Sequence, residues 1–149
     1  MFPAKGHLAT IASKVQCEYN ITLKGGAGYA APMAISDSEG RYLYRLSGFV
    51  DFDLSNDTNF DRIEALVDAT RVHLPDAELI DASACHRPIS ADDRPIVGPS
   101  RKYSNLFVCT GFGSRGWSVG LGCGKLLSNL MLGLPCEIDP TPLLPSRFG

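Results

Sequence analysis

Glycines, two serines and one arginine gather between positions 109 and 127, in the stretch CTGFGSRGWSVGLGCGKLL. Gly111, Gly113 and Gly116 form a G-x-G-x-x-G pattern that follows an apolar run and opens an expected helix. In a βαβ unit such glycines let backbone amides approach a pyrophosphate at the N-terminus of the helix. The first question is therefore whether this stretch binds a dinucleotide.

The sequence downstream does not complete a dinucleotide-binding unit. After Gly133 there is no apolar β-run, and the prolines that follow cannot sit in a central parallel strand. Glu137 and Asp139 do lie near the distance expected for a ribose-binding carboxylate. A G-x-S-x-G nucleophile elbow fails at Phe112, and Lys125 lacks the following Ser or Thr of a P-loop. The dinucleotide fingerprint is left as a minor alternative.

Gly116, Gly120 and Gly124 recur every four residues and fall on one face of the expected helix. Each glycine destabilises a helix interior by about 1 kcal/mol relative to alanine. The repeat therefore predicts that a strand or another helix packs against bare backbone there. The start of the same helix has free amides and a partial positive charge, so residues 113–118 also suit a ring edge that becomes anionic during chemistry.

The composition is that of a globular domain, with 44% apolar and 20% charged residues. The 149 residues predict one domain. The net charge of -2, without a Lys/Arg cluster, predicts no nucleic-acid partner. The five cysteines form no C-x-x-C pair, and their surroundings favour buried thiols over disulfides or a zinc site. Lacking a signal peptide and a membrane-spanning run, the protein is expected to be cytoplasmic, and a peripheral membrane location stays open for a full-length form.

Local patterns indicate the elements that must position these residues. A strand is expected in FPAKGHLATI, and a hairpin around the turn residues 36–40. The clearest helix lies in SNDTNFDRIEALVDATRVHLP, with Thr58 as its N-cap, Asp61 in its first turn and Pro75 as its stop. Its expected buried stripe comprises Phe60, Ile63, Val67, Thr70 and Leu74.

In the second half, AELIDASACHRPI is predicted to be a strand, SADDRPIVGPSRKYS a loop and NLFVCTG a buried strand. A second helix is expected from Gly116 to about Leu132, ended by Gly133 and Pro135. The tail PCEIDPTPLLPSRFG should lie extended over the surface. This order of elements predicts an α+β fold with a largely antiparallel sheet, two main helices and no complete Rossmann unit.

The segment CHRPISADDRPIVGPS, followed by NLFVCTGFGSRGWSVGLGCGKLLSNLMLGLPCEIDPTPLLPSRF, resembles the C-terminal part of FAD-dependent D-amino-acid dehydrogenases. These enzymes belong to the D-amino-acid oxidase, glycine oxidase and sarcosine oxidase superfamily. The shared features are Arg-Pro, a Pro-Ile-Val-Gly run, a strand ending in Thr-Gly, a Gly-Trp pair, a glycine-rich helix and a terminal Arg-Phe. The resemblance extends to the family's Pro-x-Lys-Gly strand. It implies one domain over 1–149, with a substrate-domain-like sheet and helix in 1–84 and a flavin-contacting segment and tail in 85–149.

The resemblance also implies roles for particular residues. Arg87, in the Arg-Pro position, would grip the substrate carboxylate, since a planar guanidinium makes two charge-assisted hydrogen bonds to it. The residues that would wrap the pyrimidine edge of a flavin are Gly113, Ser114, Arg115, Gly116, Trp117 and Ser118. The implied cofactor is FAD, and the implied substrate is a D-amino acid or another small amine whose α-hydrogen passes to the flavin as hydride. On this interpretation the glycine stretch meets a flavin ring and not a pyrophosphate.

Three positions depart from the family pattern. Phe112 stands where many relatives have His, and Arg115 stands where they often have a neutral residue, so it would add a cation near flavin or substrate. His86 beside Arg87 invites a role as general base. However, strand alternation points His86 away from the side of Arg87, and loss of hydride from a neutral amine needs no strong base.

Family members open with a Rossmann segment that holds the ADP half of FAD, and nothing like it precedes Met1. We therefore expect a C-terminal portion that needs a missing FAD-binding domain or subunit and does not retain FAD alone. Two hypotheses follow: part of an enzyme that oxidatively deaminates D-amino acids, or a non-catalytic remnant or interaction module. The surface facing the missing part should be apolar, so that a homodimer could form through it. The sequence leaves oxidase and dehydrogenase chemistry equally open.

Overall fold

The computed structural model describes residues 1–149, apart from the side chain of Lys24. The chain divides into two compact units, which are Lys5–His86 and the combination of Met1–Ala4 with Arg87–Gly149. We call them the sheet unit and the helix unit. The division falls within two strands, β1 (Phe2–Ser13) and β5 (Glu78–Ile89), so both strands contribute residues to both units.

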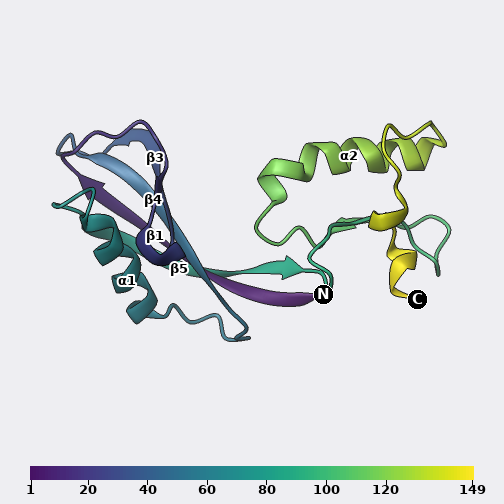
Figure 1. The fold of residues 1–149 in the computed structure, drawn as a ribbon, viewed down its shortest axis with the longest axis horizontal. Coiled ribbons are helices and arrows are strands. Elements are labelled where there is room, and N and C mark those ends of the chain that lie inside the picture. Colours follow the sequence, from purple (N-terminus) through teal and green to yellow (C-terminus); the bar gives the residue numbers. More distant parts are fainter. The chain divides into compact units, whose positions relative to one another are not determined.

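The sheet unit is built on a five-stranded antiparallel sheet in the order β2-β3-β4-β1-β5 (Figure 1). The remaining strands are β2 (Ile21–Thr22), β3 (Gly28–Ser36) and β4 (Tyr42–Asp51). β3 and β4 form the predicted hairpin, with a short 3-10 helix, η1 (Lys24–Gly26), before it. Asp37 stabilises the turn, because its carboxylate accepts hydrogen bonds from the amides of Glu39 and Arg41, both at 2.9 Å.

The helix α1 (Phe60–Arg71) packs on this sheet and buries Ile63, Leu66, Val67 and Thr70. Its N-cap is Asn59, whose side chain accepts a hydrogen bond from the Arg62 amide at 3.3 Å. The predicted cap at Thr58 was therefore wrong by one residue, since Asn and Thr are both good caps and stand side by side. Phe60 was also wrongly placed in the core: it is the first helical residue, at the open end of the stripe, and is 62% exposed.

The core of the sheet unit joins α1 to the inner face of the strands. Tyr44 is fully buried, and its hydroxyl donates to the carbonyl of Val15 at 2.6 Å and accepts from the amide of Cys17 at 2.8 Å. The polar end of this large side chain is thus satisfied inside the core. The other buried members are Ala9, Ile11, Leu23, Ala30, Leu46, Ile63, Leu66, Val67, Leu74 and Ala77.

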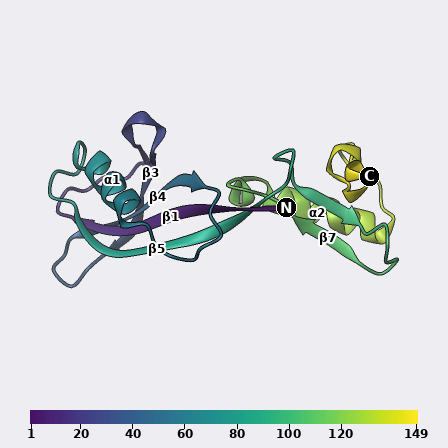
Figure 2. The same ribbon diagram turned by 90° about the horizontal axis from the view of Figure 1, so that it is seen from below.

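The helix unit consists of a two-stranded antiparallel sheet, β6 (Ile96–Pro99) with β7 (Phe107–Thr110), and the helix α2 (Gly116–Leu132). Figures 1 and 2 both show α2 lying along β7. Val97, Cys123 and Leu126 form the buried core between them. The prediction of a continuous loop before β7 was wrong, because Ile96–Pro99 form a four-residue strand that pairs antiparallel with β7, the next strand in the chain.

The end of the chain also differs from the expectation of an extended tail. It forms two short 3-10 helices, η2 (Thr141–Leu143) and η3 (Pro145–Phe148). Each has a proline in its first turn. A backbone amide at that position has no acceptor within the helix, so proline loses no hydrogen bond there. The predicted end of α2 is confirmed, since Gly133 adopts the left-handed conformation with φ 65°.

Most cysteines pack in the two cores as free thiols. Cys123 is buried, while Cys17, Cys109 and Cys136 are half-buried against core residues. Burial raises the pKa of the Cys109 and Cys123 thiols, which keeps them protonated and unreactive at neutral pH. Cys85 is exposed, so the expectation of buried thiols does not hold at that position.

Candidate functional site

Arg87 lies near the end of β5 and is half-buried. The residues after it contact the glycine turn that precedes α2: the Gly113 amide donates to the carbonyl of Pro88 at 2.9 Å, and Ile89 pairs with Phe112 in an antiparallel bridge. The backbone that carries Arg87 is thereby hydrogen-bonded to the turn. The two sets of residues singled out from the sequence are neighbours within one unit.

The turn requires glycine at two positions. Gly111 and Gly113 have φ of 75° and 55°, a left-handed conformation that other residues adopt only with strain. A side chain at Gly113 would also place its Cβ 3.4 Å from the Asp93 carboxylate and 3.5 Å from Ile89. The G-x-G spacing therefore serves a tight turn between β7 and α2.

The start of α2 has donors without acceptors. The amides of Ser118 and Val119 both donate to the carbonyl of Arg115, at 3.0 and 3.1 Å. In the part of the chain that the structure describes, the amides of Ser114, Gly116 and Trp117 have no acceptor. No side chain caps the helix, and its first turn contains no acidic residue. An uncapped helix start keeps its partial positive charge and suits a hydrogen-bond acceptor or an anion.

Arg115 directs its side chain to the loop between β5 and β6. Its guanidinium Nη2 donates to the backbone carbonyl of Asp93 and lies 3.0 Å from a carboxylate oxygen of the same residue. Both side chains are about half-exposed, so solvent screens the pair. The extra cation expected at this position therefore carries its own counter-ion, and the backbone amides remain the free donors of the turn.

His86 belongs to the sheet unit, although Arg87 is the next residue in the chain. Its ring Nε2 lies 2.7 Å from the carbonyl oxygen of Asp53. Because a carbonyl only accepts hydrogen bonds, this Nε2 must carry the hydrogen. The ring thus anchors the segment after β4 through a donor, which gives no support to a role as general base.

Arg147 belongs to the terminal Arg-Phe pair noted in the sequence, but its contacts were not predicted. Its Nε and Nη2 bind the two carboxylate oxygens of Asp92 at 2.8 and 3.0 Å, and Nη2 also donates to the Arg94 carbonyl at 2.9 Å. This guanidinium holds the pKa of Asp92 well below its ordinary value. Ser90 is buried beneath, with its Oγ 2.6 Å from the Arg94 carbonyl. The tail therefore fixes the loop that follows the strand of Arg87 and carries Asp93.

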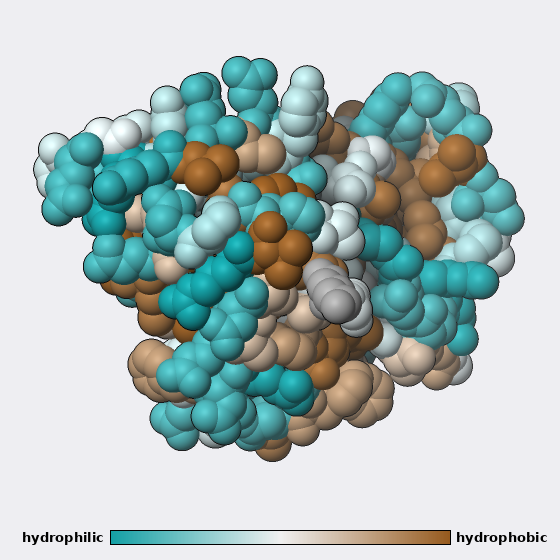
Figure 3. Space-filling view, turned by 60° about the vertical axis from the view of Figure 1, so that its left-hand side comes forward, coloured by the Kyte–Doolittle hydropathy of each residue, from teal (hydrophilic) through white to brown (hydrophobic). Residues whose placement is uncertain are grey.

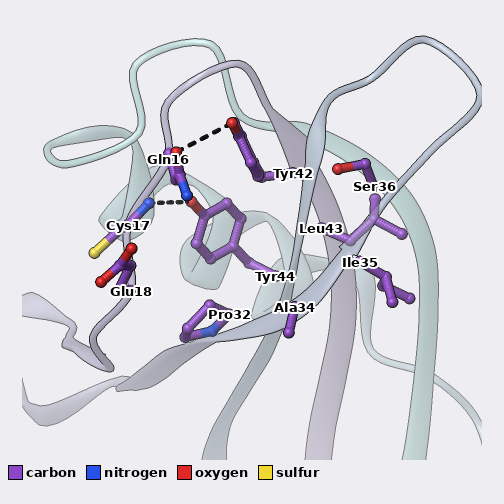
Figure 4. A pocket seen from close by; sticks show the side chains of 10 residues that line it. All are labelled: Gln16, Cys17, Glu18, Pro32, Ala34, Ile35, Ser36, Tyr42, Leu43 and Tyr44. Carbon is purple, nitrogen blue, oxygen red and sulfur yellow. Dashed lines mark hydrogen bonds between the residues drawn. The ribbon is translucent and has the colours of Figure 1, made fainter.

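A pocket of about 390 Å³ lies elsewhere, in the sheet unit (Figure 4). Pro32, Ile35 and Leu43 supply much of its apolar wall. Hydrogen bonds from Tyr42 to Gln16 and from the Cys17 amide to Tyr44 fasten one side of it. None of the residues predicted to bind substrate or cofactor lines this pocket.

The described residues lack two further kinds of feature. No group of three or more His, Cys, Asp or Glu side chains is arranged to hold a metal ion. Within the same residues, no helix has both the length and the apolar character needed to cross a bilayer.

Comparison with related sequences identifies the family of this chain. The sequence profile of the family described as "DAO: FAD dependent oxidoreductase" matches residues 1–130. D-amino acid dehydrogenase 2 from Mesorhizobium japonicum is 32% identical over 97% of this chain, which corresponds to 34% of that protein. D-amino acid dehydrogenase from Chromohalobacter salexigens is 44% identical over 42% of this chain and 15% of its own length. The chain thus spans about a third of the first relative and matches a smaller part of the second.

Solved structures share the fold at lower sequence identity. Glycine oxidase from Geobacillus kaustophilus superposes with a TM-score of 0.76 and 20% identity, over 95% of this chain and 38% of that chain. L-amino acid deaminase from Proteus myxofaciens has the same TM-score of 0.76 at 12% identity, over 99% of this chain and 44% of its own. The predicted α+β fold with a largely antiparallel sheet is confirmed. Because the profile covers most of its length, the chain belongs to the DAO family of FAD-dependent oxidoreductases.

Proposed function

We propose that this chain forms part of an FAD-dependent oxidoreductase that oxidatively deaminates a D-amino acid or another small amine. The observation that carries the proposal is the hydrogen bond between Gly113 and Pro88, which joins the strand of Arg87 to an uncapped helix start. Arg87 could bind a carboxylate, and the amides at the start of α2 could bind the edge of a ring. The two segments that carry these groups are hydrogen-bonded to each other.

Arg87 would orient the substrate by its carboxylate. A guanidinium offers two parallel N–H donors to a carboxylate, and partial burial strengthens such a pair relative to bulk water. Pro88 restricts the backbone of Arg87 to extended conformations, which fixes the direction from which the side chain leaves the strand.

The segment Gly113–Ser118 would hold the pyrimidine edge of the flavin, mainly through backbone donors. The amides of Ser114, Gly116 and Trp117 fit this role because they have no acceptor in the described chain. A helix start stabilises nearby negative charge by about 0.3–1 kcal/mol, and by up to about 2 when partly buried. FAD, when bound, supplies the acceptor for the hydride.

The proposed deamination is an oxidation of the substrate followed by hydrolysis. The α-carbon gives up its hydrogen with the bonding electron pair, while the nitrogen lone pair forms a C=N bond. The nitrogen then loses a proton, and water adds to the imine carbon to release ammonia and a keto acid. The task of Arg87 is to hold the α-carbon in place while this occurs.

Titration of the ¹⁵N-labelled chain tests both contacts. FAD is expected to shift the amide resonances of Ser114, Gly116 and Trp117 and to leave those of the β3–β4 hairpin unchanged. Benzoate, as a carboxylate probe, should shift the side-chain Nε resonance of Arg87. The titration runs to millimolar FAD because the chain alone is expected to bind FAD too weakly to retain it. If FAD at that concentration moved none of the three amides, the proposal would fail and the non-catalytic module would be favoured.

A matched pair of variants separates charge from geometry at the carboxylate site. Arg87→Lys keeps the charge and loses the planar fork, whereas Arg87→Gln loses the charge. Benzoate binding should weaken in both, and more strongly in Arg87→Gln, while the FAD-dependent amide shifts persist. Equal benzoate affinity in all three proteins would remove Arg87 from the proposed site.

A further inference from the structure

The turn between β5 and β6, residues 90–94, is held by arginines from two distant parts of the helix unit. Arg147 from the tail binds Asp92, with Nε 2.8 Å from one carboxylate oxygen and Nη2 3.0 Å from the other. Arg115 from the start of α2 binds Asp93, through its backbone carbonyl and through a carboxylate oxygen 3.0 Å away. Two neighbouring aspartates therefore join the tail to the segment proposed to contact the flavin.

Ion pairs on a protein surface are common and usually contribute little to stability. Hydrophilic residues, teal in Figure 3, cover much of the surface on the side drawn there. The pair of Arg147 with Asp92 differs from such contacts because the Arg147 side chain is only 12% exposed. Its other N–H groups donate to backbone carbonyls, Nη1 to those of Leu143 and Leu144 at 2.9 and 3.2 Å, and Nη2 to that of Arg94 at 2.9 Å. With every donor engaged, this guanidinium is fixed in position.

Asp93 has a strained backbone. Its φ of 54° lies in the left-handed region, where residues other than glycine are uncommon. Such a conformation persists where the surroundings impose it. Here Arg147 binds the carboxylate of the residue before Asp93 and the carbonyl of the residue after it. Ser90 closes the turn, since its carbonyl accepts from the Asp93 amide at 3.2 Å. The left-handed conformation of Asp93 therefore depends on the tail.

The conformation of Asp93 in turn decides where the charge of Arg115 lies. The carbonyl and the carboxylate of Asp93 both face the same guanidinium nitrogen, Nη2. A return of Asp93 to negative φ would turn these two acceptors and release the guanidinium. Because Arg115 immediately precedes α2, a released cation would lie beside the free amides of Ser114, Gly116 and Trp117. A helix start with an added cation favours anions, whereas an oxidised flavin ring presents neutral oxygen and nitrogen acceptors.

We propose that Arg147 is a positioning residue that keeps the start of α2 selective for the neutral acceptor edge of a flavin over small free anions. It acts through Asp93, which it holds in the left-handed conformation and which neutralises and fixes Arg115. The identity of the ligand rests on the proposed function. The control of Arg115 by the tail rests only on contacts within this chain.

Two ligands test this selectivity in the ¹⁵N-labelled chain: inorganic phosphate, a small anion, and lumiflavin, which has the neutral ring without phosphate. In the wild type, lumiflavin is expected to shift the amides of Ser114, Gly116 and Trp117 more readily than phosphate does. Arg147→Gln frees a charge-assisted donor for the anion, so phosphate affinity should rise about tenfold while lumiflavin affinity does not rise. A merely structural loss would weaken both ligands. Phosphate affinity that is unchanged or lower in a folded Arg147→Gln chain would overturn the proposal.

Further variants trace the gain to particular side chains. Asp93→Asn removes the counter-ion of Arg115 but leaves the tail contacts in place, and asparagine tolerates the left-handed region. It should raise phosphate affinity as much as Arg147→Gln does, and the two together should add less than twofold, because both act through Arg115. Arg115→Gln in the Arg147→Gln background should abolish the gain. Additive effects, or a gain that survives the loss of Arg115, would refute the proposed route.

Arg147→Lys provides the conservative control. Lysine keeps the charge beside Asp92 but lacks the planar fork, so phosphate affinity should be intermediate. Separate ¹⁵Nη resonances of Arg115, which show restricted rotation of its guanidinium, should be present in the wild type and lost in Arg147→Gln. If Arg147→Gln unfolds the helix unit, Arg147→Lys and Asp93→Asn provide the same test. A guanidinium that stays restricted in a folded Arg147→Gln chain would overturn the proposal.

The two ligands also separate this inference from the proposed function. If neither lumiflavin nor FAD shifts the wild-type amides, but Arg147→Gln still gains phosphate affinity through Arg115, the flavin site is refuted and the control of Arg115 stands. If lumiflavin shifts the amides and phosphate affinity is the same in every variant, the positioning role of Arg147 is refuted and the flavin site stands.

Discussion

The two units of the molecule use their helices in opposite ways. The 12 residues of α1 bury four side chains against the sheet, whereas the 17 residues of α2 bury two. The sheet unit therefore contains the partners that its own helix needs. The helix unit contains the residues for which chemistry is proposed, but leaves an apolar helix face uncovered. The comparison indicates that the sheet unit is the self-sufficient part and that the helix unit is completed by something else.

Core truncation is the largest expected effect and tests this difference directly. Leu66→Ala removes a fully buried side chain of the sheet unit and should destabilise that unit by about 2–5 kcal/mol. Leu126→Ala, in the smaller core of the helix unit, should fall at the low end of that range. Amide hydrogen exchange, followed separately for each unit, measures both. Simultaneous loss of protection in both units by either variant would show that they unfold as one body.

Backbone strain gives the next largest effect. Gly113→Ala forces a left-handed conformation and places its methyl group in van der Waals contact with Asp93 and Ile89, so we expect a loss of about 1–3 kcal/mol in the helix unit. Gly40→Ala in the sheet unit has a similar φ of 77° but no atom within 4 Å of the added Cβ. Chemical denaturation should therefore show a smaller loss for Gly40→Ala. Equal losses would mean that the contacts around Gly113 add nothing to the strain.

The capping residue of α1 is a smaller test within the sheet unit. Asn59→Ala should cost about 1 kcal/mol, because the Arg62 amide loses its acceptor. Thr58→Ala, one residue earlier, should change the stability of the chain by less than about 0.5 kcal/mol. Thermal denaturation of the two variants side by side decides between the two candidate caps. A larger loss at Thr58 would restore the prediction made from the sequence.

Acid sensitivity should show the smallest effects. Arg147 lowers the pKa of Asp92 in the helix unit, and Lys5, followed by Ser55, lowers that of Asp53 in the sheet unit. A carboxylate with a lowered pKa in the folded state stabilises above its unfolded pKa, so this stabilisation is lost as the pH falls below about 3.9. NMR-detected melting should show that Asp92→Asn flattens the acid response of the helix unit alone. If Asp92→Asn instead flattened the acid response of the sheet unit, the Arg147–Asp92 ion pair would not stabilise the helix unit as predicted.

Local signals explain what could be predicted from the sequence. The hairpin depends on turn residues beside it, and α2 on a continuous apolar run that ends at Gly133. The missed strand β6 is four residues long, sits among proline and aspartate, and exists through pairing with β7. The contact of Arg147 with Asp92 spans 55 positions, and neither residue has a local pattern that names its partner. The candidate site was found from spacing and resemblance, whereas the loop and tail that hold it depend on such distant pairs.

The division of β1 has a consequence for the order in which the molecule can be assembled. Lys5–His86 is one uninterrupted run, so its core can close while the ribosome is still adding later residues. Met1–Ala4, synthesised before that run, belong with Arg87–Gly149. Thr110 Oγ1, for example, lies 3.4 Å from Met1 Sδ. Met1–Ala4 therefore join their own unit only after residues 87–149 have emerged, and a nascent chain stalled near residue 90 would present a finished sheet unit beside an end of β1 whose unit is not yet made.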